Sequence, residues 1–241
     1  MNTQISRLYT EEDLHELLLR VHTTAREKGW WTLTTAGHDS AELAKNAKCV
    51  LEDGDLEDKL FLIVCEMAEA FEEYRKPDVD VRQVYVVHRH HQTFEKTMVP
   101  LTDEFLSQLT SSPHGRIVVG RLILNADEAA ALAKGKPEGF PIEMGDAYIR
   151  VLDLMGALDL VPEPVAIVDV GREPWRKPGK HLFKIMGQVA KADADPRRFL
   201  SHVLAGIEAC CHSMGVDLAA AIETKAAYNK TRPVRHGGKR A

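Results

Sequence analysis

Residues Lys59–Arg75 read KLFLIVCEMAEAFEEYR, and they form the most informative segment of the chain. At about 100° per residue, apolar side chains cover most of a helix built from this segment, and the charged side chains fall on one narrow face. That face carries Lys59, Glu66, Glu69 and Glu73. Like charges three or four residues apart repel each other, and more strongly when water is excluded. We therefore expect a largely buried helix with positive charge opposite its carboxylates.

A second segment, PIEMGDAYIRVLDL at Pro141–Leu154, repeats this arrangement. The charged residues that cluster on one side of it are Glu143, Asp146, Arg150 and Asp153. If the two charged faces meet, their carboxylates form an oxygen cage that suits Mg²⁺ or Mn²⁺, whereas zinc favours imidazole and thiolate ligands. Magnesium sites of this kind commonly coordinate substrate phosphates, so the pattern indicates phosphate chemistry. For either helix alone, a solvated acidic stripe is the alternative.

Apolar residues at helical spacing recur along the chain and predict an all-α fold with a core of four to five helices. The expected helices are Glu11 to about Glu27, Leu56–Tyr74, Pro141–Leu158, about Pro196 to Met214, and Asp217–Asn229. We expect a single domain, residues 1–241, with insertions at about 78–137 and 159–180. The first insertion contains β-branched runs that suit a short β-hairpin, and the second is rich in proline.

The composition is that of an ordinary globular protein, with 241 residues, 44% hydrophobic and 28% charged, and a formal net charge of -5. No run of about 18 apolar residues is present to span a bilayer, and the N-terminal segment is too charged for a signal peptide. We therefore expect a cytoplasmic protein without membrane attachment. The mild acidity argues against stable nucleic-acid binding, because that function needs a basic face.

The four cysteines show no CxxC spacing, and they are Cys49, Cys65, Cys210 and Cys211. This pattern suits neither a simple disulfide framework nor a zinc knuckle, so we expect buried thiols. The sequence also contains no GxxxxGK[ST] or GxGxxG phosphate loop, which argues against kinases and dinucleotide-dependent enzymes.

The C-terminal segment is basic, because from Lys225 onward there are six Lys or Arg and no Asp or Glu. One helix face, at i, i+4, i+7 spacing, carries Lys225, Asn229 and Arg232, and just beyond follow Arg235, His236 and Lys239. Charge-assisted hydrogen bonds from such a face suit phosphate groups, with arginine suited to a bidentate grip. The alternative is that these cations only complement the helix dipole.

Two aromatic residues, Trp30 and Trp31, follow the first expected helix. Trp31 is a candidate for stacking on a planar ligand ring, and the alternative is that the tryptophans close the core. A histidine-rich run in the first insertion contains His88, His90 and His91. No carboxylate or thiolate accompanies it at ligand spacing, so we interpret it as a solvated polar strand edge.

The motifs Glu66-Met67-Ala68-Glu69 and Glu143-Met144-Gly145-Asp146 resemble the ExxE…ExxD signature of the MazG-like, all-α nucleoside triphosphate pyrophosphohydrolases. The segment Asp217–Arg240 is similar to the closing helix and tail of that family, and the matching segments cover about half of the chain. The sequence departs from the family pattern in that 73 residues separate Glu69 from Glu143, where the family has a short loop. A second insertion precedes residue 215.

The resemblance implies a MazG-like helical bundle that cleaves nucleoside triphosphates to monophosphates and pyrophosphate with Mg²⁺, by in-line attack of water on the α-phosphorus. By motif position, the implied metal ligands are Glu66, Glu69, Glu143 and Asp146. Glu66 or Glu69 would double as general base, with Glu73 and Asp153 in support. The residues expected to bind substrate are Lys225, Asn229, Arg232, Arg235, Lys239 and Trp31. Related enzymes build active sites at subunit interfaces, so we expect a homodimer or homotetramer.

Two alternatives stay open at the level of sequence. One is pyrophosphate removal from another nucleotide, such as dUTP or phosphoribosyl-ATP. The other is a module that binds a nucleotide or a protein without turnover. Within the first interpretation we expect a preference for dGTP and GTP, because guanine offers two adjacent hydrogen-bond donors that carboxylates or backbone carbonyls accept.

Overall fold

The computed structural model describes residues 8–33, 49–52, 54–77, 80–89, 96–102, 107, 117–119, 122–124, 126–165 and 178–234. This part of the chain is mostly helical, which confirms the all-α expectation in its coarse form. Its helices are α1 (Glu11–Glu27), α3 (Asp55–Tyr74), α5 (Ala126–Ala133), α6 (Phe140–Ala157), α7 (Pro178–Val189), α8 (Pro196–Ser213) and α9 (Leu218–Thr231). All five expected helices are present, with ends within a few residues of the predicted ones.

Local sequence explains where these helices begin. The side chains of Thr10, Asp195 and Asp217 each accept a hydrogen bond from a backbone N–H in the first turn of the helix that follows. Helix α6 starts differently, with Pro141 in its first turn after Gly139, whose φ of 119° favours glycine. The expected N-cap at Asp217 is confirmed.

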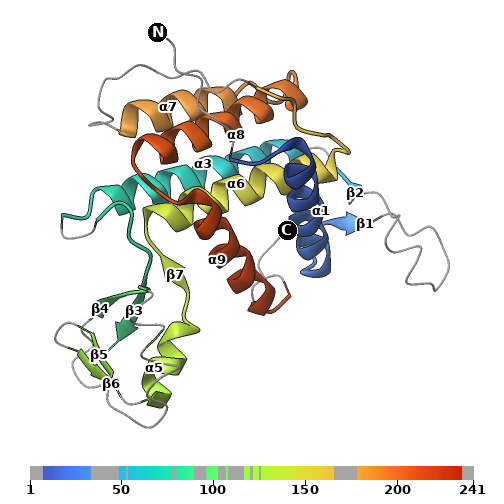
Figure 1. Ribbon diagram of the computed structural model, residues 1–241. Coiled ribbons are helices and arrows are strands. Elements are labelled where there is room, and N and C mark those ends of the chain that lie inside the picture. Colours follow the sequence, from blue (N-terminus) through green and yellow to red (C-terminus); the bar gives the residue numbers. More distant parts are fainter. Residues whose placement is uncertain are drawn as a thin grey trace, which may run out of the picture.

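Helix α6 is the centre of the molecule. Every side chain from Phe140 to Ile149 is buried, and the helix packs against α1, α3, α8 and α9. In Figure 1, α3 and α6 run side by side, α7 and α8 cover them on one side, and α1 and α9 lie on the other. The buried carboxylates of α6, Glu143 and Asp146, therefore lie inside the bundle instead of in solvent.

Helix α7 was not among the expected helices, although its apolar residues Leu182, Ile185 and Val189 follow helical spacing and are buried. The prolines before it led us to extend the second insertion to residue 180, whereas the helix begins at Pro178. Proline is tolerated in the first turn of a helix, so here it marks a start. Helix α7 packs on α3 and α8 and belongs to the core.

The described segments between residues 80 and 138 form a small lobe beside the bundle, which we call the β-insertion (Figure 1). Its antiparallel sheet has the order β4-β3-β7, with β3 (Tyr85–Arg89), β4 (Lys96–Pro100) and β7 (Pro137–Glu138). A second hairpin joins β5 (Ile117–Val119) to β6 (Leu122–Leu124). The expected β-hairpin is therefore confirmed. The side chain of His88, and residues His90 and His91, lie outside the described part of the chain.

The β-insertion has its own apolar cluster, formed by Val86, Val99, Ala129 and Leu132 and separate from the main core. Another short antiparallel pair, β1 (Thr32–Leu33) with β2 (Cys49–Val50), follows α1. No single helix of the described segments has the length and apolar composition needed to cross a membrane. Helices α8 and α9 meet that requirement only as a pair, and the pair is bent by 116°.

Candidate active site

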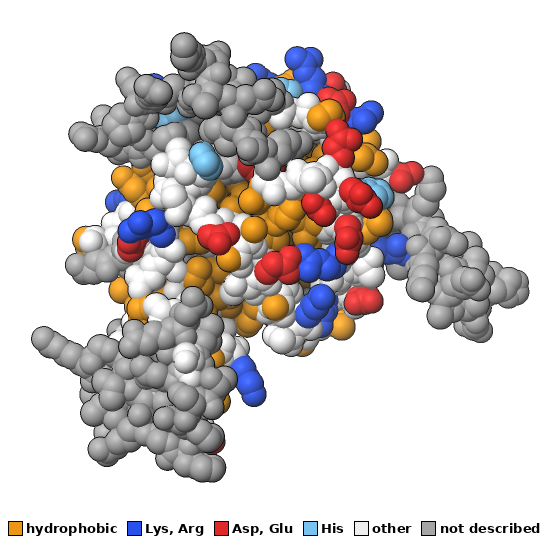
Figure 2. Space-filling view, viewed as in Figure 1, with side chains coloured by type: hydrophobic (Ala, Val, Ile, Leu, Met, Phe, Trp, Pro, Cys, Tyr) orange, Lys and Arg blue, Asp and Glu red, His pale blue; other side chains and the backbone are white. Residues whose placement is uncertain are grey.

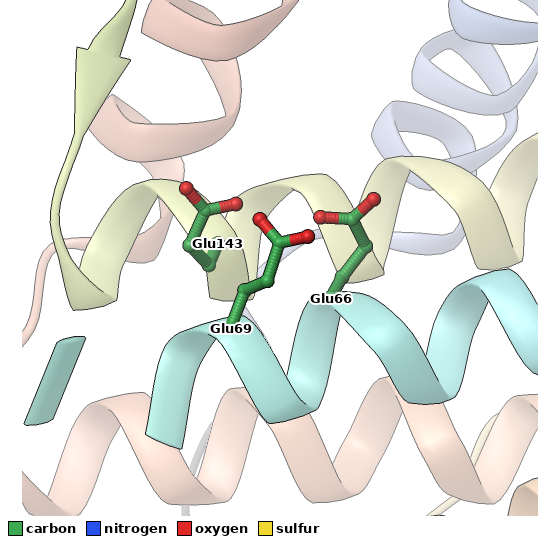
Figure 3. Close-up of side chains that lie close together, drawn as sticks. All are labelled: Glu66, Glu69 and Glu143. Carbon is green, nitrogen blue, oxygen red and sulfur yellow. The ribbon is translucent and has the colours of Figure 1, made fainter. Parts of the chain in front are cut away.

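Three carboxylates converge between α3 and α6. Glu66 and Glu69 lie three residues apart on one face of α3, and Glu143 projects from α6 toward them (Figure 3). One carboxylate oxygen from each residue lies within 4.8 Å of the other two. We call Glu66, Glu69 and Glu143 the carboxylate triad, and it confirms that the two charged helix faces meet.

The members of the triad differ in burial. Glu66 is 6% and Glu143 is 3% exposed, whereas Glu69 is open to solvent. Burial raises the pKa of Glu143 to about 7, against the opposing effects of Lys225 and Lys136. Burial and the nearby Asp146 also raise the pKa of Glu66.

Positive charge lies opposite these carboxylates, as the sequence predicts. The Arg150 guanidinium donates to Glu66 Oε1, with a distance of 2.6 Å from Nε. The Lys225 ammonium, on α9 and only 2% exposed, lies 2.9 Å from Asp146 Oδ2 and 3.9 Å from Glu143 Oε2. Burial acts to raise the pKa of Asp146, but Lys225 and Arg150 outweigh it and hold that pKa below its ordinary value.

The residues present fit a hard divalent cation. Glu143 Oε2 is buried and makes no hydrogen bond with the described part of the protein, which is costly unless another group satisfies it. Three carboxylates from two rigid helices supply the oxygen ligands that Mg²⁺ and Mn²⁺ prefer, and exposed Glu69 leaves one side open to solvent. Asp146, the fourth expected ligand, is not part of the triad, because its carboxylate is held by Lys225.

A basic pocket adjoins the triad. Asp146 and Arg150 line it, so the Glu66–Arg150 ion pair connects the triad to the pocket wall. The other polar and aromatic residues of the lining are Arg20, Thr24, Lys28, Trp30, Trp31, Lys59, Asp153, Asn229, Lys230 and Arg232. Six of the side chains that line the pocket are Arg or Lys and two are Asp, which favours an anionic ligand.

Two of the expected phosphate-binding residues, Asn229 and Arg232, line this pocket. Asn229 hydrogen-bonds Asp146, while its Oδ1 atom is buried without a hydrogen-bond partner among the described residues. The Arg232 guanidinium lies 5.8 Å from the centre of the Tyr228 ring, and burial lowers the pKa of Arg232. Lys225 binds carboxylates instead of lining the pocket. Arg235, His236 and Lys239 lie outside the described residues.

Trp31 lines the pocket but is mostly buried, with 6% exposure. Its Nε1 donates to Asp153 Oδ1 at 2.8 Å, and the Lys59 ammonium lies 4.5 Å from its ring centre. The tryptophan therefore closes the core and also forms part of the pocket wall. Trp30, half-buried, lines the pocket as well.

The expected supporting carboxylates have partners of their own. Glu73 accepts hydrogen bonds from Lys76 at 2.5 Å and from the Tyr85 hydroxyl at 2.6 Å. Asp153 accepts from Trp31 and contacts His22 Nδ1 at 2.8 Å. Sequence reasoning missed His22, which lies 131 positions from Asp153, and Tyr85, which belongs to the β-insertion whereas Glu73 lies on α3.

A second hollow opens on the other side of the triad. Glu69 and Glu143 line it together with Lys136 and the apolar side chains of Phe71, Leu182, Phe183 and Met186. On the face shown in Figure 2, acidic and basic side chains are mixed over α1 and α9, with apolar side chains visible between them. The bidentate pair of Arg20 with Glu223 joins these two helices.

Comparison of the chain with protein-family models, curated proteins and solved structures gives no significant match.

Proposed function

We propose that this chain is a Mg²⁺-dependent, MazG-like nucleoside triphosphate pyrophosphohydrolase that converts (d)NTP to (d)NMP and pyrophosphate. One observation carries the proposal. A triad of carboxylates, with a buried Glu143 oxygen that accepts no hydrogen bond from the described residues, lies beside a pocket lined by arginines, lysines and tryptophans. Carboxylates suit the metal, and the cationic, aromatic pocket suits a nucleotide phosphate and base.

The triad would hold the cation, with Asp146 as an additional ligand that Lys225 positions. Bound there, Mg²⁺ lowers the pKa of water and offsets the negative charge of the phosphates. Glu69 is the better candidate for the general base, because Glu66 is engaged by Arg150 whereas Glu69 is exposed.

The phosphates would lie against Asn229 and Arg232, which line the pocket next to Asp146. Arg232 contributes charge-assisted hydrogen bonds that a neutral side chain cannot replace. Lys225 was expected to bind phosphate, but its interior position supports a structural role. Its ammonium neutralises Asp146 and Glu143, so that the carboxylates stay together when no metal is bound.

The deciding experiment measures pyrophosphate release by the full chain from all canonical NTPs and dNTPs, with Mg²⁺ or with EDTA. We expect release with Mg²⁺ and none with EDTA, and the highest kcat/KM with dGTP and GTP. Activity confined to dUTP or phosphoribosyl-ATP would identify a related pyrophosphohydrolase. Nucleotide binding without pyrophosphate release would instead indicate a binding module, and the proposal would be wrong.

The expected homodimer or homotetramer and the cytoplasmic location belong to the same proposal. Light scattering of the full chain measures the oligomeric state. A monomeric mass together with full activity would show that no partner subunit completes the site.

A further inference from the structure

A cysteine, a histidine and an aspartate form a linear hydrogen-bonded cluster on the side of α6 near α1. Cys49 Sγ, in β2, lies 3.6 Å from His22 Nε2, on α1. His22 Nδ1 lies 2.8 Å from Asp153 Oδ1, on α6. We call these three residues the thiol cluster, and none of them belongs to the carboxylate triad.

The hydrogen bonds determine which atoms carry protons. A carboxylate oxygen accepts, so Nδ1 of His22 carries the proton that faces Asp153. In the neutral ring, Nε2 of His22 then carries the lone pair, and it lies 3.6 Å from the Cys49 sulfur. This is the order of groups in which a base removes the proton of a nucleophile while a carboxylate holds the base in place.

The His22 ring is held firmly by its surroundings. A Cβ atom at Gly156 would lie 2.7 Å from His22 Cγ, so only glycine leaves room for the ring against α6. The Trp31 indole donates to the same Asp153 oxygen and meets the His22 ring edge-on, with ring centres 6.0 Å apart. These contacts restrict the rotamer of His22 and keep Nε2 directed at Cys49.

The thiol needs a base in order to react. Burial raises the pKa of Cys49, and Asp153 adds to the effect while Arg26 and Lys59 oppose it. The thiol is therefore protonated at neutral pH, and only the thiolate is a strong nucleophile. Cys49 is half-buried, so a small electrophile can reach it, unlike the buried Cys210 and Cys211.

We propose that Cys49 is a site of covalent oxidation by peroxides, with His22 as the base and Asp153 as the residue that positions it. His22 Nε2 takes the thiol proton, and the sulfur attacks one peroxide oxygen. The S–O bond forms as the O–O bond breaks, and the leaving hydroxide takes the proton from His22 and departs as water. With hydrogen peroxide, thiol and peroxide thus become sulfenic acid and water.

The test treats the full chain with hydrogen peroxide in the presence of dimedone, which traps sulfenic acids, and quantifies each cysteine peptide by mass spectrometry. Cys65, half-buried on α3 and outside the thiol cluster, is the internal control. We expect Cys49 to be labelled at least about tenfold faster than Cys65, the lower end of what a positioned base contributes. Equal labelling of Cys49 and Cys65 in the wild type would overturn the proposal without any variant.

Two variants separate a base from a structural contact. H22Q should slow labelling of Cys49 at least about tenfold and leave Cys65 unchanged. G156A should act in the same direction, because its Cβ displaces the His22 ring. Labelling of the buried Cys210 and Cys211 reports unfolding in each variant. Unchanged Cys49 labelling in a folded H22Q protein would show that His22 is not the base.

Discussion

At the residue scale, Glu69 stands apart from the other two carboxylates of the triad. It is exposed and makes no ion pair with the described residues, whereas Glu66 and Glu143 are buried near Arg150 and Lys225. The E69Q variant keeps the side-chain volume but removes a charged ligand and the proposed base. We expect kcat/KM for pyrophosphate release to fall at least about a hundredfold, with an unchanged far-UV circular dichroism spectrum.

The matched control is E57Q, which removes another exposed carboxylate from the first turn of the same helix. It should keep activity within about threefold of wild type, since it only weakens a helix-dipole interaction. If E69Q also stays within that range, the assignment of Glu69 to the metal site is wrong.

Glu143 gives the metal-free protein a pH dependence of stability. Its pKa is raised on folding from 4.5 to about 7, so the folded protein binds this proton more tightly than the unfolded chain does. The stabilisation is complete below the unfolded pKa and is lost as pH rises through the folded pKa. In EDTA, the free energy of unfolding should therefore fall across that window, by roughly 3 kcal/mol from this residue.

In E143Q the side chain at position 143 cannot titrate, so the free energy of unfolding of this variant should not show that fall with rising pH. Urea unfolding of both proteins at several pH values measures the difference, and parallel profiles would contradict it. Adding Mg²⁺ above neutral pH should stabilise the wild type more than E143Q, because binding to the folded state alone shifts the equilibrium.

At the scale of elements, the close approach of α6 and α9 depends on Gly145. A Cβ atom there would lie 3.2 Å from the carbonyl carbon of Ala221 and 3.3 Å from the nitrogen of Ile222. Both contacts are backbone atoms, and the Lys225–Asp146 ion pair ties the two helices together nearby. G145A should therefore destabilise the fold by about 1–3 kcal/mol despite the better helix propensity of alanine.

The comparison variant is G187A in α7, where a Cβ atom meets nothing within 4 Å. There only the better helix propensity of alanine should act, and it should stabilise the fold by about 0.5–1 kcal/mol. Chemical denaturation measures both variants. If G145A is as stable as G187A, α9 can shift away from α6 more easily than its contacts suggest.

At the scale of the whole molecule, the chain divides into a helical bundle and the β-insertion. The two have separate apolar cores, and Val86 is fully buried in the smaller one. V86A removes two methyl groups there and should cost the β-insertion about 1–3 kcal/mol. Hydrogen exchange should then accelerate within residues 80–138 and stay as in the wild type in α3, α6 and α9.

Acceleration of exchange throughout the bundle would show instead that the two parts unfold together. The contacts of Tyr85 with Glu73 and Lys76 are where such coupling would arise, because they link β3 to the end of α3.

The expected helices could be predicted from the sequence because helical periodicity and capping are local. Apolar residues three or four apart define a buried face, and Thr10, Asp195 and Asp217 are suited to begin helices by their own chemistry. The convergence of Glu66, Glu69 and Glu143 was predictable for a related reason. A buried carboxylate is costly unless a positive charge or another ligand compensates it. Carboxylates on two otherwise apolar helices are therefore expected to face each other and a counter-charge.

The partners of those carboxylates were decided only by the tertiary structure. Lys225 was expected to bind phosphate, yet its contact with Asp146 depends on how α9 crosses α6, which no local pattern encodes. The thiol cluster is a stronger case, because His22 and Asp153 lie 131 positions apart and Cys49 was expected to be simply buried. Hydrogen bonds between distant residues depend on helix packing to within a fraction of an ångström, and periodicity along the chain carries no such information.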